Sequence, residues 1–177
     1  MTERELQHLL DQAAIERVVY DYATGLDTKD WALWRSIFTD EVQVRFRPAA
    51  EAEFTGLGQD WVAMTADEWV EGRRVLFTGL ATTQHQMTNP RITIDGDTAT
   101  CIMYMQAIHF LPGAPEAEYT LGGYYVDDLV RTPEGWKLAR VNLNVTWERG
   151  DATMLERGRE LGRRLVHGEG TTMTKEL

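Results

Sequence analysis

Apolar residues recur every three or four positions along the first part of the chain, which predicts an amphipathic helix with one buried stripe. Thr2 and Glu5 have the spacing of a capping box, so this helix should begin there and end between Gly25 and Thr28. Asp30 is placed to cap a second, shorter helix. The stripe of the first helix comprises Leu6, Leu9, Leu10, Ala13, Ile15, Val18, Val19, Tyr22 and Leu26, and the second helix is expected to carry Trp31, Trp34, Ile37 and Phe38.

The pattern then changes to strict alternation. Val42, Val44 and Phe46 alternate with polar residues, which predicts a half-buried strand, and a loop is expected from Pro48 to Gln59. A second capping box, Thr65 with Glu68, opens a helix expected over 66–77. Further strands are predicted at about 85–94, 98–110, 119–131 and 136–147, followed by a last helix at about 152–166.

Helices followed by a run of strands indicate an α+β fold with the helices gathered on one face of a mainly antiparallel sheet. A long, bent sheet covered in this way leaves a hollow between its two layers, which is a natural site for a small molecule. The 177 residues fit one domain, expected over 1–167, with a flexible tail over 168–177.

Composition restricts the partners. A net charge of −10 argues against nucleic acid, whose phosphates require a basic surface. The basic residues of the last helix are interrupted by acids and are interpreted as a solvated face. Cys101 is the single cysteine, so no disulfide within the chain is expected and a reducing compartment fits. With no signal peptide and no apolar run of membrane-spanning length, we expect a soluble, cytoplasmic protein without a membrane partner.

The candidate chemistry starts from the four histidines. His8 lies on a predicted helix among polar neighbours and His167 lies in the tail, and both are interpreted as surface residues. His85 opens a predicted strand directly after a helix. His109 shares one face of the next strand with apolar residues, so it is expected to point inward. The apolar members of that face are Cys101, Met103, Met105 and Ala107.

Asp27 lies at the end of the first helix, where the helix dipole disfavours a carboxylate that has no compensating partner. Two interpretations remain open: Asp27 caps a turn while His85 is an ordinary core histidine, or the two side chains form an acid–base pair. In the second case a neutral imidazole could remove a proton from carbon. The carboxylate would fix the tautomer and stabilise the imidazolium as it forms.

Three blocks of sequence, in order and spanning roughly residues 12–147, resemble the SnoaL-like proteins of the NTF2-like superfamily. They are Ala14-Ile15 with Tyr22, 26–31 and 37–40; 83–85 with Asn89, Ile92 and 95–97; and 127–131 with 135–138. The resemblance implies a cone-shaped α+β fold, in which N-terminal helices pack on a curved mixed or antiparallel sheet around a pocket.

Within this superfamily the chain is most similar to the scytalone dehydratase and hexachlorocyclohexane dehydrochlorinase types. Both pair a carboxylate at the end of the first helix with a histidine that opens a strand, and the corresponding residues here are Asp27 and His85. His109 matches a second pocket histidine of the dehydratase type. The two tyrosines that hold water over the substrate of the dehydratase fall at Leu26 and Phe46, so dehydration of scytalone itself is not expected.

The dehydrochlorinase type also has a pocket arginine. The corresponding position here lies near Val141, so Arg140 would have to turn inward to replace that arginine. The resemblance therefore specifies a site and a class of chemistry rather than one substrate.

From these observations we expect a cofactor-independent lyase or isomerase that acts on a small, mainly apolar cyclic molecule. Asp27 and His85 would be catalytic, and His109 or Tyr22 would polarise an oxygen or assist a leaving group. The alternative is a non-catalytic binding or assembly module of the same fold. Hydration by an activated water ranks below elimination, because it needs more polar groups. The residues expected to bind the substrate are Tyr22, Trp31, Val44, Phe46, Met103, Met105 and His109.

No cofactor or metal is expected. The chain has no dinucleotide-binding, Walker or nucleophile-elbow motif, and its histidines lack the spacing of a local metal-binding motif. A homodimer or homotrimer is expected, because the outward faces of such sheets commonly pair. The strand positions Arg140, Asn142 and Asn144 are expected to offer that surface.

Overall fold

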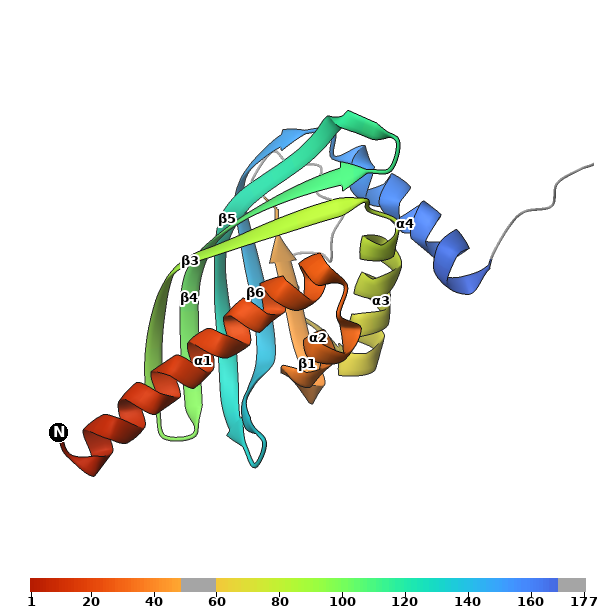
Figure 1. Cartoon of the computed structure of the whole chain (residues 1–177). Coiled ribbons are helices and arrows are strands. Elements are labelled where there is room, and N and C mark those ends of the chain that lie inside the picture. Colours follow the sequence, from red (N-terminus) through yellow and green to blue (C-terminus); the bar gives the residue numbers. More distant parts are fainter. Residues whose placement is uncertain (49–59, 169–177) are drawn as a thin grey trace, which may run out of the picture.

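The computed structural model describes residues 1–48 and 60–168. Figure 1 shows α1 lying across one face of a curved sheet of long strands, with α3 and α4 close together near one end of it. This arrangement confirms the predicted α+β fold. In chain order the elements are α1 (Glu3–Thr28), α2 (Trp31–Ser36), β1 (Phe38–Arg47), β2 (Val62–Thr65), α3 (Ala66–Thr78), β3 (Thr82–Asp95), β4 (Thr98–Leu111), β5 (Ala114–Thr132), β6 (Gly135–Gly150) and α4 (Thr153–His167).

The six strands form one mixed sheet in the order β2-β1-β6-β5-β4-β3. Strands β3 to β6 form an antiparallel meander, and β1 runs parallel to β6 at the other side. The alternation predicted for β4 is confirmed, since Cys101, Met103, Met105, Ala107 and His109 are all buried on one face. This face points toward the helices and forms one wall of the core.

Both predicted capping boxes are present. The Thr2 hydroxyl accepts from the Glu5 backbone N–H at the start of α1, and the Thr65 hydroxyl accepts from that of Glu68 at the start of α3. The carboxylate of Asp30 accepts from the Leu33 N–H and caps α2. These local signals were sufficient to place the beginnings of three helices.

The predicted stripe of α1 is wrong in its first half. Leu6, Leu9 and Leu10 are exposed, whereas Asp11 is buried. The N-terminal turns of α1 extend past the sheet, as Figure 1 shows. The apolar side chains of these turns therefore have no surface of the sheet to pack against. The Asp11 carboxylate instead accepts two hydrogen bonds from the Arg131 guanidinium, at 2.6 and 2.7 Å, and ties α1 to β5.

Two elements differ from the expectation near the second helix. Phe38 begins strand β1 rather than ending a helix, because α2 closes at Ser36 and Ile37 is its C-cap. The short strand β2 was not predicted, and it pairs antiparallel with β1 at the sheet edge. Residues 49–59 of the expected loop and residues 169–177 of the expected tail lie outside the described residues.

Helices α3 and α4 touch through backbone. A Cβ atom at Gly162 would lie 1.6 Å from the Val75 carbonyl oxygen, and one at Gly79 would lie 1.8 Å from that of Gly158. Glycine at these positions therefore allows α4 to approach close enough to bring Leu155 to the cavity between helices and sheet. No helix within the described ranges is long and apolar enough to cross a membrane.

Candidate active site

The last turn of α1 brings Asp27 against the beginning of β3. The Asp27 carboxylate accepts hydrogen bonds from the Thr83 hydroxyl (2.8 Å) and from the His85 backbone N–H (2.7 Å). The His85 Nδ1 atom lies 2.7 Å from Asp27 Oδ1. Thr83 and His85 are two residues apart on one strand, so both side chains face the same carboxylate.

These contacts define the protonation of the pair. Burial opposes the ionisation of Asp27, but the hydrogen bonds from His85 and Thr83 outweigh it and hold the pKa of Asp27 below its usual range. An ionised carboxylate can only accept, so a neutral His85 carries its proton on Nδ1. Its Nε2 atom is then left with a free lone pair. This is the tautomer that a base requires for removing a proton from a ligand.

His109 differs from His85 in its partner. Its Nδ1 atom lies 3.1 Å from the carbonyl oxygen of Tyr119, which fixes the proton on that nitrogen. Burial first, and the neighbouring His85 second, lower the pKa of His109 to about 3. His109 is therefore neutral at physiological pH, and its Nε2 is free to accept a hydrogen bond.

The cavity that contains these groups has a volume of about 50 Å³. Its wall is mainly apolar, and its polar members are the two histidines, two tyrosines and an arginine. The lining residues are Tyr22, Leu26, Phe46, Arg73, Leu76, Phe77, His85, Met105, Ala107, His109, Leu121, Tyr125, Leu143 and Leu155.

Arg73 is an unexpected member of this wall. It comes from α3, and its guanidinium carbon lies 4.1 Å from the ring centroid of Trp69 and 4.8 Å from that of Phe46. Burial lowers the pKa of Arg73 to about 10, so the side chain stays charged at neutral pH. The aromatic faces supply cation–π contacts to this charge.

Two tyrosines stand near Arg73. The rings of Tyr22 and Tyr125 meet edge to face with centroids 5.7 Å apart. Burial raises the pKa of Tyr22 to about 12 and that of Tyr125 well above its ordinary value, so both are neutral phenols, and their side chains are hydrogen-bonded to each other.

The residues proposed from sequence to bind the substrate separate into two groups. Tyr22, Phe46, Met105 and His109 line the cavity with His85. The other three lie elsewhere: Trp31 packs edge to face on Trp34, Val44 is fully buried in the core, and Met103 is buried beside a hollow on the other face of the sheet.

Thr83 and Arg73 were not singled out from the sequence, although each has a local signal. Thr83 is two residues before His85 and so shares its face of the strand. Arg73 stands one turn after Trp69 and one turn before Phe77, within the apolar stripe of α3. Arg140 does not turn inward to replace the pocket arginine of the dehydrochlorinase type, because it is exposed and its Nε donates to the Gln43 side chain.

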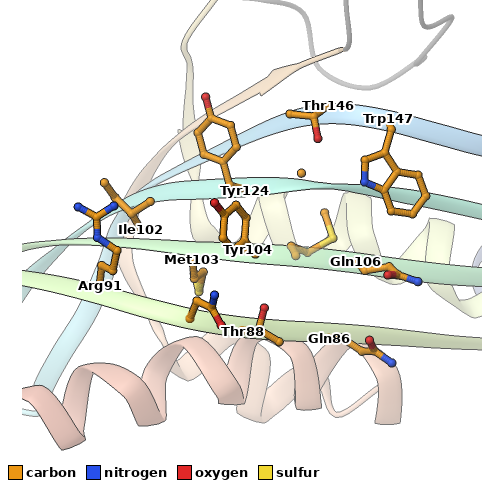
Figure 2. A pocket seen from close by; sticks show the side chains of 13 residues that line it. Gln86, Thr88, Arg91, Ile102, Met103, Tyr104, Gln106, Tyr124, Thr146 and Trp147 are labelled. Atoms are coloured by element: carbon orange, nitrogen blue, oxygen red, sulfur yellow. The ribbon is translucent and has the colours of Figure 1, made fainter.

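A second, larger hollow of about 690 Å³ lies on the outer face of the sheet. Figure 2 shows its labelled side chains on neighbouring strands, among them Tyr104, Gln106 and Trp147. Arg91 is its single charged lining residue in the described part of the chain, and no histidine or carboxylate lines it. Of these two cavities, the smaller, inner one is therefore the one that histidines line.

Metal binding was the competing use of two histidines and a carboxylate. Within residues 1–48 and 60–168, no group of three or more His, Cys, Asp or Glu side chains is arranged to hold a metal ion. Asp27 directs both carboxylate oxygens to Thr83 and His85, and His109 directs Nδ1 to a backbone carbonyl.

Comparison with known proteins identifies relatives over most of the chain. An uncharacterised protein of Mycobacterium tuberculosis is 26% identical over 131 residues, which cover 73% of this chain and 82% of the relative. A crystal structure from Kribbella flavida is 27% identical, with a TM-score of 0.74, and covers 84% of this chain and 99% of that one.

Two further structures share the fold at lower identity. A candidate scytalone dehydratase of Novosphingobium aromaticivorans is 23% identical with a TM-score of 0.67, covering 81% of this chain and 89% of that one. A hexachlorocyclohexane dehydrochlorinase of Novosphingobium barchaimii is 19% identical with a TM-score of 0.65, covering 84% and 94%. The model of the SnoaL-like domain matches residues 7–142, most of the sequence, and the chain therefore belongs to this family.

Proposed function

We propose that the protein is a cofactor-independent lyase or isomerase that begins its reaction by removing a proton from a carbon atom of a small, mainly apolar cyclic molecule. The observation that carries this proposal is the contact between Asp27 and His85. It holds the proton on Nδ1 and leaves Nε2 free in an apolar cavity. A positioned base of this kind contributes roughly 10²- to 10⁴-fold to the rate.

The surroundings of His85 suit a base that must become charged during the reaction. Its side chain is only 6% exposed, so little water competes with the substrate for the imidazole. The carboxylate of Asp27 stabilises the imidazolium, and this stabilisation is stronger in an apolar cavity than in water. Neutral His109 supplies no competing positive charge, and its free Nε2 can accept a hydrogen bond from a hydroxyl of the substrate.

The test uses a panel of cyclic ketones and cyclic molecules with a leaving group beside an acidic C–H. Turnover is followed by proton exchange with deuterated water and by release of the leaving group. We expect activity in the parent and its loss in His85→Ala, with little change in the thermal midpoint. The surface variant His8→Gln serves as the matched control and should retain activity.

Full activity of His85→Ala would overturn the catalytic role of this residue. Saturable binding of panel members without exchange or release in the parent would instead favour the alternative, a non-catalytic module that uses the same cavity for binding.

We also propose that the protein assembles as a homodimer or homotrimer through the outer face of the sheet. Tyr104 and Trp147 are 59% and 43% exposed on this face, beside the hollow of about 690 Å³. Asn142 and Asn144, which were expected to form part of the subunit contact, are both buried, and Asn142 accepts a hydrogen bond from Arg45. They are therefore no longer proposed for that contact. The two aromatic side chains therefore become the main candidates for the contact.

A further inference from the structure

Arg73 brings a positive charge into the inner cavity. Its half-buried side chain lines the same wall as His85, and its guanidinium packs against the faces of Trp69 and Phe46. Phe77 lies close to both Arg73 and His85. Phe77 lies four residues after Arg73, about one turn of about 5.4 Å along α3, and its ring lies 5.8 Å from that of His85.

This charge has no acidic partner in the described part of the chain. No carboxylate forms an ion pair with Arg73, and the nearby charged group that acts on it, Arg159, is also positive. By contrast its neighbour Arg74 pairs with Glu71 at 2.6 Å. Removing a charge from water without a counter-ion is costly, and aromatic faces offset only part of that cost.

The neighbouring phenols add neutral donors and no negative charge. Tyr22 and Tyr125 interact electrostatically with Arg73 and line the same cavity. The Tyr22 and Tyr125 side chains are hydrogen-bonded to each other, so one of their two O–H groups is left for a ligand. Together with the guanidinium it forms a donor set that matches an oxygen atom bearing negative charge. The inner cavity therefore has a base at the Asp27–His85 end and hydrogen-bond donors near Arg73.

We propose that Arg73, assisted by Tyr22 and Tyr125, is the subsite for the carbonyl or carboxylate oxygen of the substrate. This inference rests on the proposed function and narrows its substrate class to molecules with an acidic C–H beside a carbonyl group. Because His85 and Arg73 line one small cavity, a single ligand can place its reacting carbon near His85 and its oxygen near Arg73.

The reaction that follows is balanced within the cavity. His85 Nε2 takes the proton, the electron pair of the C–H bond forms a carbon–carbon double bond, and the carbonyl electron pair moves to oxygen. Arg73 stabilises the resulting enolate. The proton then returns to another carbon in an isomerisation, or accompanies a leaving group expelled as the enolate collapses in an elimination.

Binding of two ring probes of similar shape, benzoate and benzamide, tests the subsite without requiring turnover. Quenching of tryptophan fluorescence reports binding, because Trp69 contacts Arg73. We expect benzoate to bind the parent about 10- to 100-fold more tightly than benzamide, as a charge-assisted contact implies. Arg73→Met should abolish this preference, and Arg73→Lys should retain part of it.

Three further measurements separate the possible outcomes. Arg74→Met is the matched control, since it removes a neighbouring charge that is already paired, and it should leave the preference unchanged. His85→Ala should also retain the preference, so an inert base and an absent subsite give different results. The thermal midpoint of Arg73→Met should not fall, because the variant removes a poorly solvated charge.

Equal affinities of the parent for the two probes would overturn the proposal. So would a preference for benzoate that survives in Arg73→Met, or failure of benzoate to saturate the parent up to its solubility limit. If Arg73→Met does not fold, the test rests on Arg73→Lys. A smaller preference for benzoate over benzamide in this variant supports the subsite, and an unchanged preference counts against it.

Discussion

The rings of His85 and His109 meet edge to face with centroids 5.8 Å apart, yet their hydrogen-bond partners differ in charge. His85 is bonded to the Asp27 carboxylate, whereas His109 is bonded to the neutral carbonyl of Tyr119. A carboxylate stabilises a protonated imidazole far more than a carbonyl does. Two adjacent histidines therefore differ in environment: His85 faces a carboxylate, whereas burial keeps His109 neutral.

The tautomer of His85 should depend on Asp27. In the parent we expect nitrogen NMR to show the proton of neutral His85 on Nδ1. In Asp27→Asn the charged acceptor is lost, so the form with the proton on Nε2 should appear, and any turnover should fall by about 10²- to 10⁴-fold. Thr83→Val removes one hydrogen bond and keeps the carboxylate, so its effect should be smaller. An unchanged tautomer in Asp27→Asn would contradict the coupling.

His109 should lower the free energy of unfolding as the pH falls. Its folded pKa of about 3 lies below the ordinary value of about 6.5, so the unfolded chain binds a proton where the folded chain does not. This contribution to the free energy of unfolding is complete above about pH 6.5 and declines as pH falls toward 3.

Urea unfolding at pH 5 and pH 7 measures the effect. The parent should lose about 1–2 kcal/mol more than His109→Gln over this interval. Other groups that titrate there, including buried Asp127 with its raised pKa, are present in both proteins and cancel in the difference. Identical slopes in the two proteins would show that His109 is not held neutral by the fold.

The contact between α3 and α4 should be intolerant of even one methyl group. Gly162→Ala places a Cβ atom 1.6 Å from a carbonyl oxygen, so the helices must separate, and unfolding should become easier by roughly 1–3 kcal/mol. Gly72→Ala is the matched control in α3. Its Cβ meets nothing within 4 Å, so better helix propensity should raise the free energy of unfolding by about 0.5–1 kcal/mol. Equal effects in urea unfolding would contradict the close approach.

Assembly through the outer sheet face is checked by light scattering at micromolar concentration. The parent should have the mass of a dimer or trimer, and Tyr104→Arg should shift it toward the monomer by placing a charge in the contact. Leu165→Arg alters an equally exposed apolar residue on α4 and should have no effect. A monomeric parent would refute the proposed assembly.

Local signals in the sequence were sufficient for most of the fold. Capping residues and alternation depend on a few neighbouring positions, and they located the helix starts and the inward face of β4. The burial of α1 depends on where the sheet ends, which no local pattern encodes, so Leu9 and Leu10 were misassigned. The edge strand β2 has four residues, of which Met64 alone is partly buried, so it gives no clear alternation.

Part of the candidate site could be anticipated from the sequence. The neighbourhood of Asp27 and His85 followed from a family resemblance, while Thr83 could have been found from its spacing to His85. Arg73 was missed because an arginine in an apolar stripe usually extends its head to solvent. Whether it does so depends on the rings that surround it, and those rings come from α3 and β1 together.

The inner cavity holds about 50 Å³, whereas an apolar cavity of about 150 Å³ accommodates benzene. A ring can enter only after wall residues such as Leu155 or Met105 move aside, so encounter at the surface and entry into the cavity are separate steps. At high ligand concentration the observed rate of uptake then levels off. We therefore expect the motion of these side chains, rather than diffusion, to set the fastest rate at which a ring compound is taken up.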